Sequence, residues 1–104
     1  MRPIYLTLTA PGETAPIPLD LHAKPFNVSV FIIITGTANA TLQYTGDNVQ
    51  ELGYDPDNGN WFDHADLDGV TATAVGTIIA PVRAVRMSVA SVTGSVQLQV
   101  LQAG

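Results

Sequence analysis

The sequence predicts a small all-β domain, a two-sheet β-sandwich or jelly roll of seven to eight short antiparallel strands. Apolar and polar residues alternate with period two along much of the chain, as in half-buried strands. Clusters of Gly, Pro, Asn and Asp separate the apolar runs. No stretch keeps a period of 3.6 residues, so at most one helical turn is expected, near 65–67. A chain of 104 residues suffices for one domain, spanning 1–104.

The first strands are expected in the N-terminal half. Residues 4–9 alternate strictly and end at Pro11-Gly12. Residues 15–21 are expected to follow a sheet edge, because Pro16 and Pro18 cannot donate to a ladder.

The segment 26–35 is the strongest predicted strand. Its even-numbered positions from 28 to 34 are all aliphatic, and Phe31 and Ile33 make the opposite face apolar as well. Phe31 and Ile33 are therefore expected to lie under a covering segment or against another subunit. Gly36-Thr37-Ala38 predicts a tight turn, so that 27–45 forms a β-hairpin.

Three more strands are expected towards the C-terminus. The ranges 71–79, 82–91 and 95–102 are rich in Val and Thr, which favour strands. Thr93-Gly94 has the spacing of a hairpin turn between the last two.

Charge and composition exclude several function classes. The formal net charge is −5, only 12% of residues are charged, and the four basic residues form no run. Nucleic-acid binding and adsorption to an anionic membrane are therefore not expected. The longest apolar run is too short to span a bilayer, no signal peptide is visible, and the lack of cysteine favours folding in the cytoplasm. So few charges are typical of a subunit that buries much of its surface against neighbours.

Seven of the nine acidic residues lie within 47–68, which raises the question of a cation site. The run Asp55-Pro-Asp-Asn-Gly-Asn departs from a calcium loop, because Gly59 stands at position five and Asp66 at position twelve. A solvated loop in which Asp and Asn form turns is favoured over a bound cation. No metal and no cofactor is predicted; His22 and His64 lack metal-ligand spacing.

A catalytic site is not expected. The four serines fall in or beside predicted strands, and none lies in a nucleophile elbow. Cysteine is absent, and the two histidines are far apart in the sequence. We therefore predict that the chain is not an enzyme.

Trp61 and Phe62 are two adjacent large aromatic residues inside the acidic segment. They either anchor the loop, with one of them capping the core, or form a contact hot spot. A carbohydrate-binding β-sandwich is an alternative, with Trp61, Phe62 and Tyr54 as a stacking platform and Asp57 or Asp63 holding calcium.

The stretch 61–102 resembles small structural proteins of tailed-bacteriophage virions. Three motifs carry the resemblance: the aromatic–acid loop Trp61-Phe-Asp-His64, the strand Pro81-Val-Arg-Ala-Val-Arg86, and the terminal strand that ends in Leu101-Gln102.

The resemblance implies a capsid decoration, or cement, protein on the capsid exterior that binds itself as a dimer or trimer and binds a major capsid protein. A tail, neck or fibre-base protein of the same particle is the alternative. Arg83 and Arg86 then become candidate interface residues. The complete set of interface candidates is Phe31, Ile33, Trp61, Phe62, Arg83 and Arg86.

Overall fold

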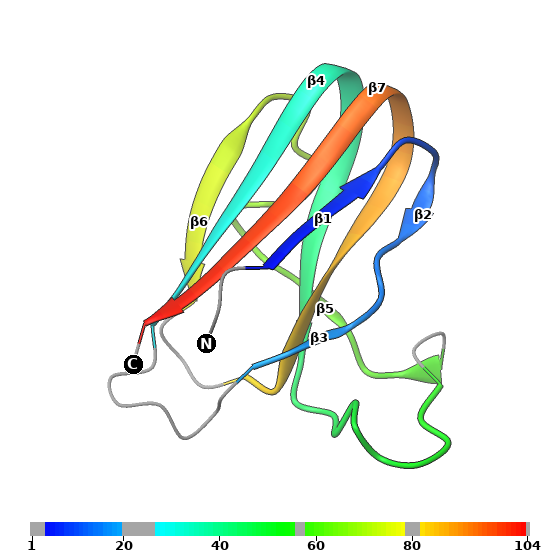
Figure 1. Ribbon diagram of the computed structural model, residues 1–104, viewed down its shortest axis with the longest axis vertical. Helices are drawn as coiled ribbons and strands as arrows, with labels where there is room; N and C mark the ends of the chain where they lie inside the picture. Colours follow the sequence, from blue (N-terminus) through cyan, green and yellow to red (C-terminus); the bar gives the residue numbers. More distant parts are fainter. Residues whose placement is uncertain (1–3, 20–26, 56–57, 79–81, 104) are drawn as a thin grey trace.

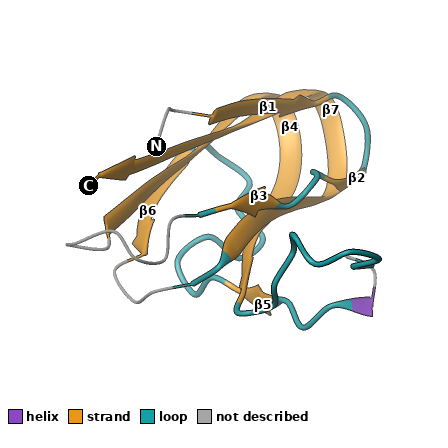
Figure 2. Cartoon of the chain, turned by 60° about the horizontal axis from the view of Figure 1, so that its bottom comes forward, coloured by secondary structure: helices purple, strands orange, loops and turns teal. Residues whose placement is uncertain are grey.

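The computed structural model describes residues 4–19, 27–55, 58–78 and 82–103, and their seven strands form one antiparallel sheet (Figures 1 and 2). The all-β prediction is confirmed, and no α-helix occurs in these ranges. The strands are β1 (Ile4–Leu8), β2 (Gly12–Glu13), β3 (Ile17–Pro18), β4 (Asn27–Thr45), β5 (Phe62–Asp63), β6 (Ala74–Ile78) and β7 (Ala84–Ala103).

A long ribbon of two strands is the centre of the fold. β4 has 19 residues and β7 has 20, and they pair from Asn27↔Ala103 to Thr45↔Ala84. The two predicted hairpins are therefore wrong, because the backbone does not reverse its direction at Gly36 in β4 or at Gly94 in β7. Instead the whole ribbon bends over at its top in Figure 1.

The bend coincides with a pair of facing glycines, Gly36 and Gly94. Both have positive φ, 92° and 106°. A Cβ on Gly36 would meet the carbonyl oxygen of Thr93, and one on Gly94 would meet that of Thr35. Only residues without a side chain allow this approach of the two backbones. The same glycines that predicted turns thus bend two continuous strands.

A β-bulge keeps the ribbon's apolar side chains on the inner side along its whole length. Asn39 pairs with Ser91 and Ala40 with Val89, so one residue of β7, Ala90, has no partner. An extra residue shifts the alternation of a strand by one position. The inward-facing apolar residues of β7 are accordingly odd-numbered before the bulge and even-numbered after it. The buried apolar residues on the inner side of the ribbon are Val28, Val30, Ile32, Ala38, Ala40, Leu42, Val85, Met87, Val89, Val96, Leu98 and Val100.

The glycine pair divides the sheet into two halves with different flanking strands. In the first half, β1 lies beside residues 95–103 of β7, and β6 lies beside 27–35 of β4. In the second half, β2 and β3 flank 84–91 of β7, while β5 and an isolated bridge from Val70 flank 38–45 of β4.

The remaining strand predictions hold in part. Ile17–Pro18 pairs with β7 as an edge, in agreement with the proline argument, but residues 20–21 lie outside the described ranges. The strand expected at 71–79 is the shorter β6, and Ile79 is not described. Residues 65–67 form turns. None of the described segments is a helix long and apolar enough to cross a membrane.

Candidate interaction surfaces

The outward side of the first half has no charged residue in its strand segments, and we call it the neutral face. One row crosses all four strands in register: Tyr5, Gln99, Phe31 and Val75. No acidic or basic residue occurs in the strand segments of this half. The outward-facing residues are Tyr5, Thr7, Ser29, Phe31, Ile33, Thr35, Val75, Thr77, Gln97, Gln99 and Leu101.

Apolar side chains are unusually accessible on the neutral face. Tyr5 is 56% exposed and Val75 59%, while Phe31 and Ile33 between them are half-buried. Gln99 donates a side-chain hydrogen bond to Gln97 (2.7 Å), so these two amides satisfy part of their hydrogen-bonding capacity within the face. Exposed and half-buried apolar side chains thus share one uncharged face, and apolar surface patches of this kind mark contact surfaces.

The outward side of the second half is polar. Glu13, Ser88 and Thr41 are in register, and the Thr41 hydroxyl donates to Asp68 (3.4 Å). In the next row, the Nε of Arg86 donates to the Oε1 of Gln43 at 2.8 Å. Gln43 then donates to Asp63 at 2.9 Å. Two residues of the acidic segment, Asp63 and Asp68, thus accept hydrogen bonds from the outward side chains of this half.

The loop of residues 46–60 is closed at its base by Thr45 and Asp47. The buried Thr45 hydroxyl donates to the Asn60 carbonyl (2.7 Å) and accepts the Asp47 N–H (3.0 Å). The Asp47 carboxylate accepts the Asn60 N–H (2.7 Å) and the Tyr54 hydroxyl (3.2 Å). Asp47 therefore holds both sides of the loop together.

The contacts of this loop shift two pKa values in opposite directions. The backbone N–H of Asn60, donating to the carboxylate, lowers the pKa of Asp47 below its ordinary 3.8, although desolvation opposes the shift. Burial raises the pKa of the Tyr54 hydroxyl, and its hydrogen bond to Asp47 acts in the same direction. Both shifts favour the pair in which Asp47 is ionised and Tyr54 is the donor.

Asp and Asn act as turn formers elsewhere in the loop, as the sequence predicts. Gln50 N–H donates to the Asn48 side chain at 3.2 Å. The Asn58 side chain donates to Asp55 at 2.7 Å. Among the described residues, no three His, Asp or Glu side chains are grouped to hold a metal ion. His22 and Asp57 lie outside the described ranges.

Arg86 and Trp61 form a stacked pair at the junction between loop and sheet. The guanidinium carbon of Arg86 lies 4.4 Å from the centre of the Trp61 ring, within cation–π distance. Arg86 is buried, only 8% exposed, and Trp61 is partly covered. These two interface candidates are therefore packed against each other inside the chain.

Phe62 lies on the other side of β5 from Trp61. Its ring stacks on Tyr44 with centroids 6.2 Å apart, and Tyr44 meets His64 edge to face. Phe62 nevertheless remains 57% exposed. The structure thus separates Trp61 and Phe62 instead of placing them side by side on one stacking platform.

His64 is a buried residue at the base of the segment that follows β5. Its Nδ1 accepts the Asp66 N–H (3.2 Å), and its Nε2 lies 3.0 Å from the Thr77 carbonyl oxygen. An imidazole that accepts at Nδ1 and donates at Nε2 satisfies both partners in its neutral form. Both ring nitrogens are therefore engaged with the backbone, which ties this segment to β6.

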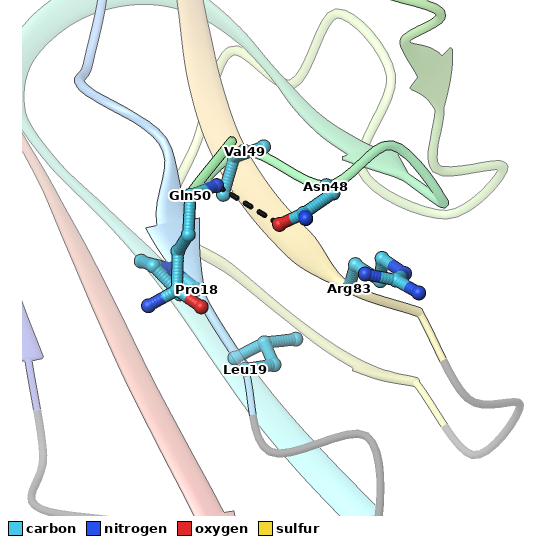
Figure 3. Close-up of a pocket in the computed structure, with 6 residues that line it drawn as sticks. All are labelled: Pro18, Leu19, Asn48, Val49, Gln50 and Arg83. Atoms are coloured by element: carbon cyan, nitrogen blue, oxygen red, sulfur yellow. Dashed lines mark hydrogen bonds between the residues drawn. The ribbon is translucent and has the colours of Figure 1, made fainter. Parts of the chain in front are cut away.

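Arg83 borders a small hollow between the ends of β3, β7 and the loop (Figure 3). The volume of the hollow is ≈ 40 Å³, whereas sites for small molecules usually measure ~300–1,000 Å³. This hollow is therefore far smaller than a usual small-molecule site. Its lining residues are Pro18, Leu19, Asn48, Val49, Gln50 and Arg83.

Sequence reasoning missed the role of Asp47 and the burial of Arg86. Asp47 was only one of seven acids in the segment, and its partners lie 7 and 13 residues further along the chain. The burial of Arg86 had no local signal: alternation with Val85 and Met87 places its side chain on the outward side of β7, and Trp61, which packs against it, is distant in the sequence.

Comparisons with protein-family models, with curated proteins and with solved structures found no match for this chain.

Proposed function

We propose that this chain is a non-catalytic structural protein that links protein surfaces, and that it decorates and stabilises a bacteriophage capsid. One observation carries the proposal. The four large apolar side chains that are more than half exposed in the described ranges fall on two separate surfaces. Tyr5 and Val75 lie on the neutral face, whereas Leu52 lies in the loop of residues 46–60 and Phe62 lies in β5, two segments that we together call the loop end. A protein that cements an assembly needs two such contacts.

The finer fold belongs to the same proposal: the bent sheet is a jelly roll of two four-stranded layers. The glycine pair divides β4 and β7 into two segments each. With β1, with β2 and β3 taken together, with β5 and the Val70 bridge taken together, and with β6, this gives eight segments, which we number in chain order. Their pairing then runs 1-8-3-6 in the first half and 2-7-4-5 in the second, the order of a jelly roll. Jelly rolls occur in viral capsid proteins, among other families.

The loop end is the proposed contact with the major capsid protein. Leu52 is fully exposed, and Phe62 is presented by a segment that Asp47 and His64 tie down. An apolar group on an ordered support loses little conformational entropy when it is buried in a complex. The acidic residues around it favour a partner surface with positive charge.

The test is the content of the particles made by the phage that encodes the chain. Quantitative mass spectrometry should find the chain in many copies per particle, and cryo-electron microscopy should place it on the capsid exterior. A position at the tail, neck or fibre base would favour the alternative role. Absence from purified particles would refute the proposal for both locations.

A pair of variants connects the function with the loop end. Leu52→Asp is expected to weaken binding to particles that lack the protein at least tenfold, because it puts a charge where an apolar contact is proposed. The variant should fold normally, since the Leu52 side chain is fully exposed in the monomer. Thr93→Asp, an equally charged change at an exposed position at the bend of the ribbon, serves as the control for a surface change. Unchanged binding of Leu52→Asp would show that the loop end is not the contact.

A further inference from the structure

We propose that the neutral face binds the neutral face of a second copy of this chain, giving a two-fold symmetric, face-to-face dimer. The inference rests on the proposed function for its biological meaning, since a cement protein gains strength from linked copies. Its physical basis is independent of any capsid and lies in the charge, shape and size of the face.

Charge distribution favours a second copy as the occupant. The chain carries a net charge of −5, so two copies repel each other when their acidic regions meet. Seven of the nine acids lie in 47–68, and the strand segments of the neutral face carry none. Two copies can therefore make close contact through this face with the least electrostatic cost.

Shape and chemistry make the face complementary to itself. A two-fold axis places the same patch on both sides of an interface. The row of Tyr5, Gln99, Phe31 and Val75 would then meet its own copy, with apolar contacts from the three apolar residues and hydrogen bonds between the Gln99 amides. Two sheets with the same twist pack well with their strands about 30° apart, ~10 Å between layers.

The size of the face sets the expected affinity. Four strands about 4.8 Å apart, with five to nine residues each, give a face roughly 19 Å wide and about 17–30 Å long. This area is below the ~800 Å² per partner of a standard stable interface. A reversible dimer with a micromolar or weaker Kd is therefore expected.

Analytical ultracentrifugation across a wide concentration range tests the dimer. The wild-type chain should shift from monomer to dimer, and Val75→Lys should weaken the association at least tenfold by placing a buried charge in each half of the interface. Tyr5→Lys should act in the same way. Both side chains are more than half exposed, so these variants should fold, which circular dichroism checks.

Leu52→Lys is the matched control, because it makes the same kind of change at a fully exposed position outside the face and should leave the dimer intact. A wild-type chain that stays monomeric, or a Val75→Lys chain that dimerises like the wild type, would overturn the inference. If the wild-type chain is monomeric and Val75→Lys abolishes its binding to particles, the capsid and not a second copy occupies the neutral face. In that case the dimer is refuted and the proposed function stands.

Cross-linking tests the geometry. The chain contains no cysteine, so Gln99→Cys would place one thiol in the middle of the neutral face. A short bismaleimide should join two such chains efficiently, whereas Leu52→Cys should remain unjoined. A dimer that is joined through position 52 but not through position 99 would exclude the face-to-face arrangement.

Discussion

The two halves of the bent ribbon share one backbone but present opposite chemistry to their surroundings. Across the first half, one register row reads Tyr5, Gln99, Phe31 and Val75. Across the second half, a comparable row joins Glu13, Ser88 and Thr41 to Asp68. Both rows stand on the outer side of the same two strands, yet one is largely apolar and the other is polar.

The two halves differ in what their outward side chains contact. In the second half, these side chains bind the segment 61–68: Gln43 donates to Asp63, Thr41 donates to Asp68, and the Arg86 guanidinium lies over the Trp61 ring. In the first half, the outward side chains of Phe31, Ile33 and Val75 make no hydrogen bond and no ring contact with any part of the chain that the structure describes. An outward face that serves no intramolecular purpose is the better candidate for contact with another molecule.

The largest expected effect comes from the bend that creates the two halves. Gly36→Ala should cost about 3–5 kcal/mol of the free energy of unfolding, because the new Cβ meets a backbone carbonyl and φ is positive. Urea denaturation measures the loss. Gly53→Ala is the control: its φ is also positive, but a Cβ there meets nothing within 4 Å, so only about 1–2 kcal/mol is expected. Equal losses would show that the close approach of the strands is unimportant.

A smaller effect, confined to the second half, is expected from Arg86. Arg86→Ala removes the hydrogen bond to Gln43 and the cation over Trp61, and should cost about 1–3 kcal/mol. Trp61 is the single tryptophan of the chain, so its fluorescence should report the local change directly. Arg86→Lys keeps a positive charge near Trp61 but lacks the planar guanidinium that donates to Gln43, so it should recover only part of the lost free energy of unfolding. Dimerisation through the neutral face should be unaffected as long as the variant is folded, and a loss of it would couple the halves.

The smallest effect concerns pH and the loop of the second half. The pKa of Asp47 is lower in the folded chain, so its ionised form stabilises the loop above the ordinary value of 3.8. This contribution is lost as the pH falls through the lowered folded pKa. Loop order, followed by Trp61 fluorescence, should therefore decline in strongly acidic solution. In Asp47→Asn this part of the pH dependence should disappear; identical profiles would contradict the role of Asp47.

How far the sequence predicted the fold depends on the range of each signal. Alternation identified the core positions of β1, β4 and β7, because a strand with one buried face must repeat with period two. It also singled out Phe31 and Ile33 as apolar residues on the wrong side for the core. The glycines at 36 and 94 were recognised, but their meaning was not: a positive φ fits a hairpin turn and a bend equally well.

The candidate surfaces were predicted less completely. Trp61 and Phe62 stood out as adjacent aromatic residues. Their side chains lie on opposite sides because the backbone is extended here, at the start of the two-residue strand β5, which the sequence pattern did not predict. The hydrogen bonds of Asp47 and Arg86 connect residues 7 to 43 positions apart, so local propensity carries no information about them.

By itself, the sequence determined the all-β class, the apolar alternation that supplies the core, and the distribution of charge, because these depend on residue type and local period. Only the tertiary structure decided that β4 and β7 run unbroken through their glycines. It also decided that the bulge at Ala90 keeps both halves of β7 facing inward. The physical reason is that pairing between distant strands selects one of several backbone paths that the same glycines permit, and that choice gathers Tyr5, Phe31 and Val75 into one neutral face.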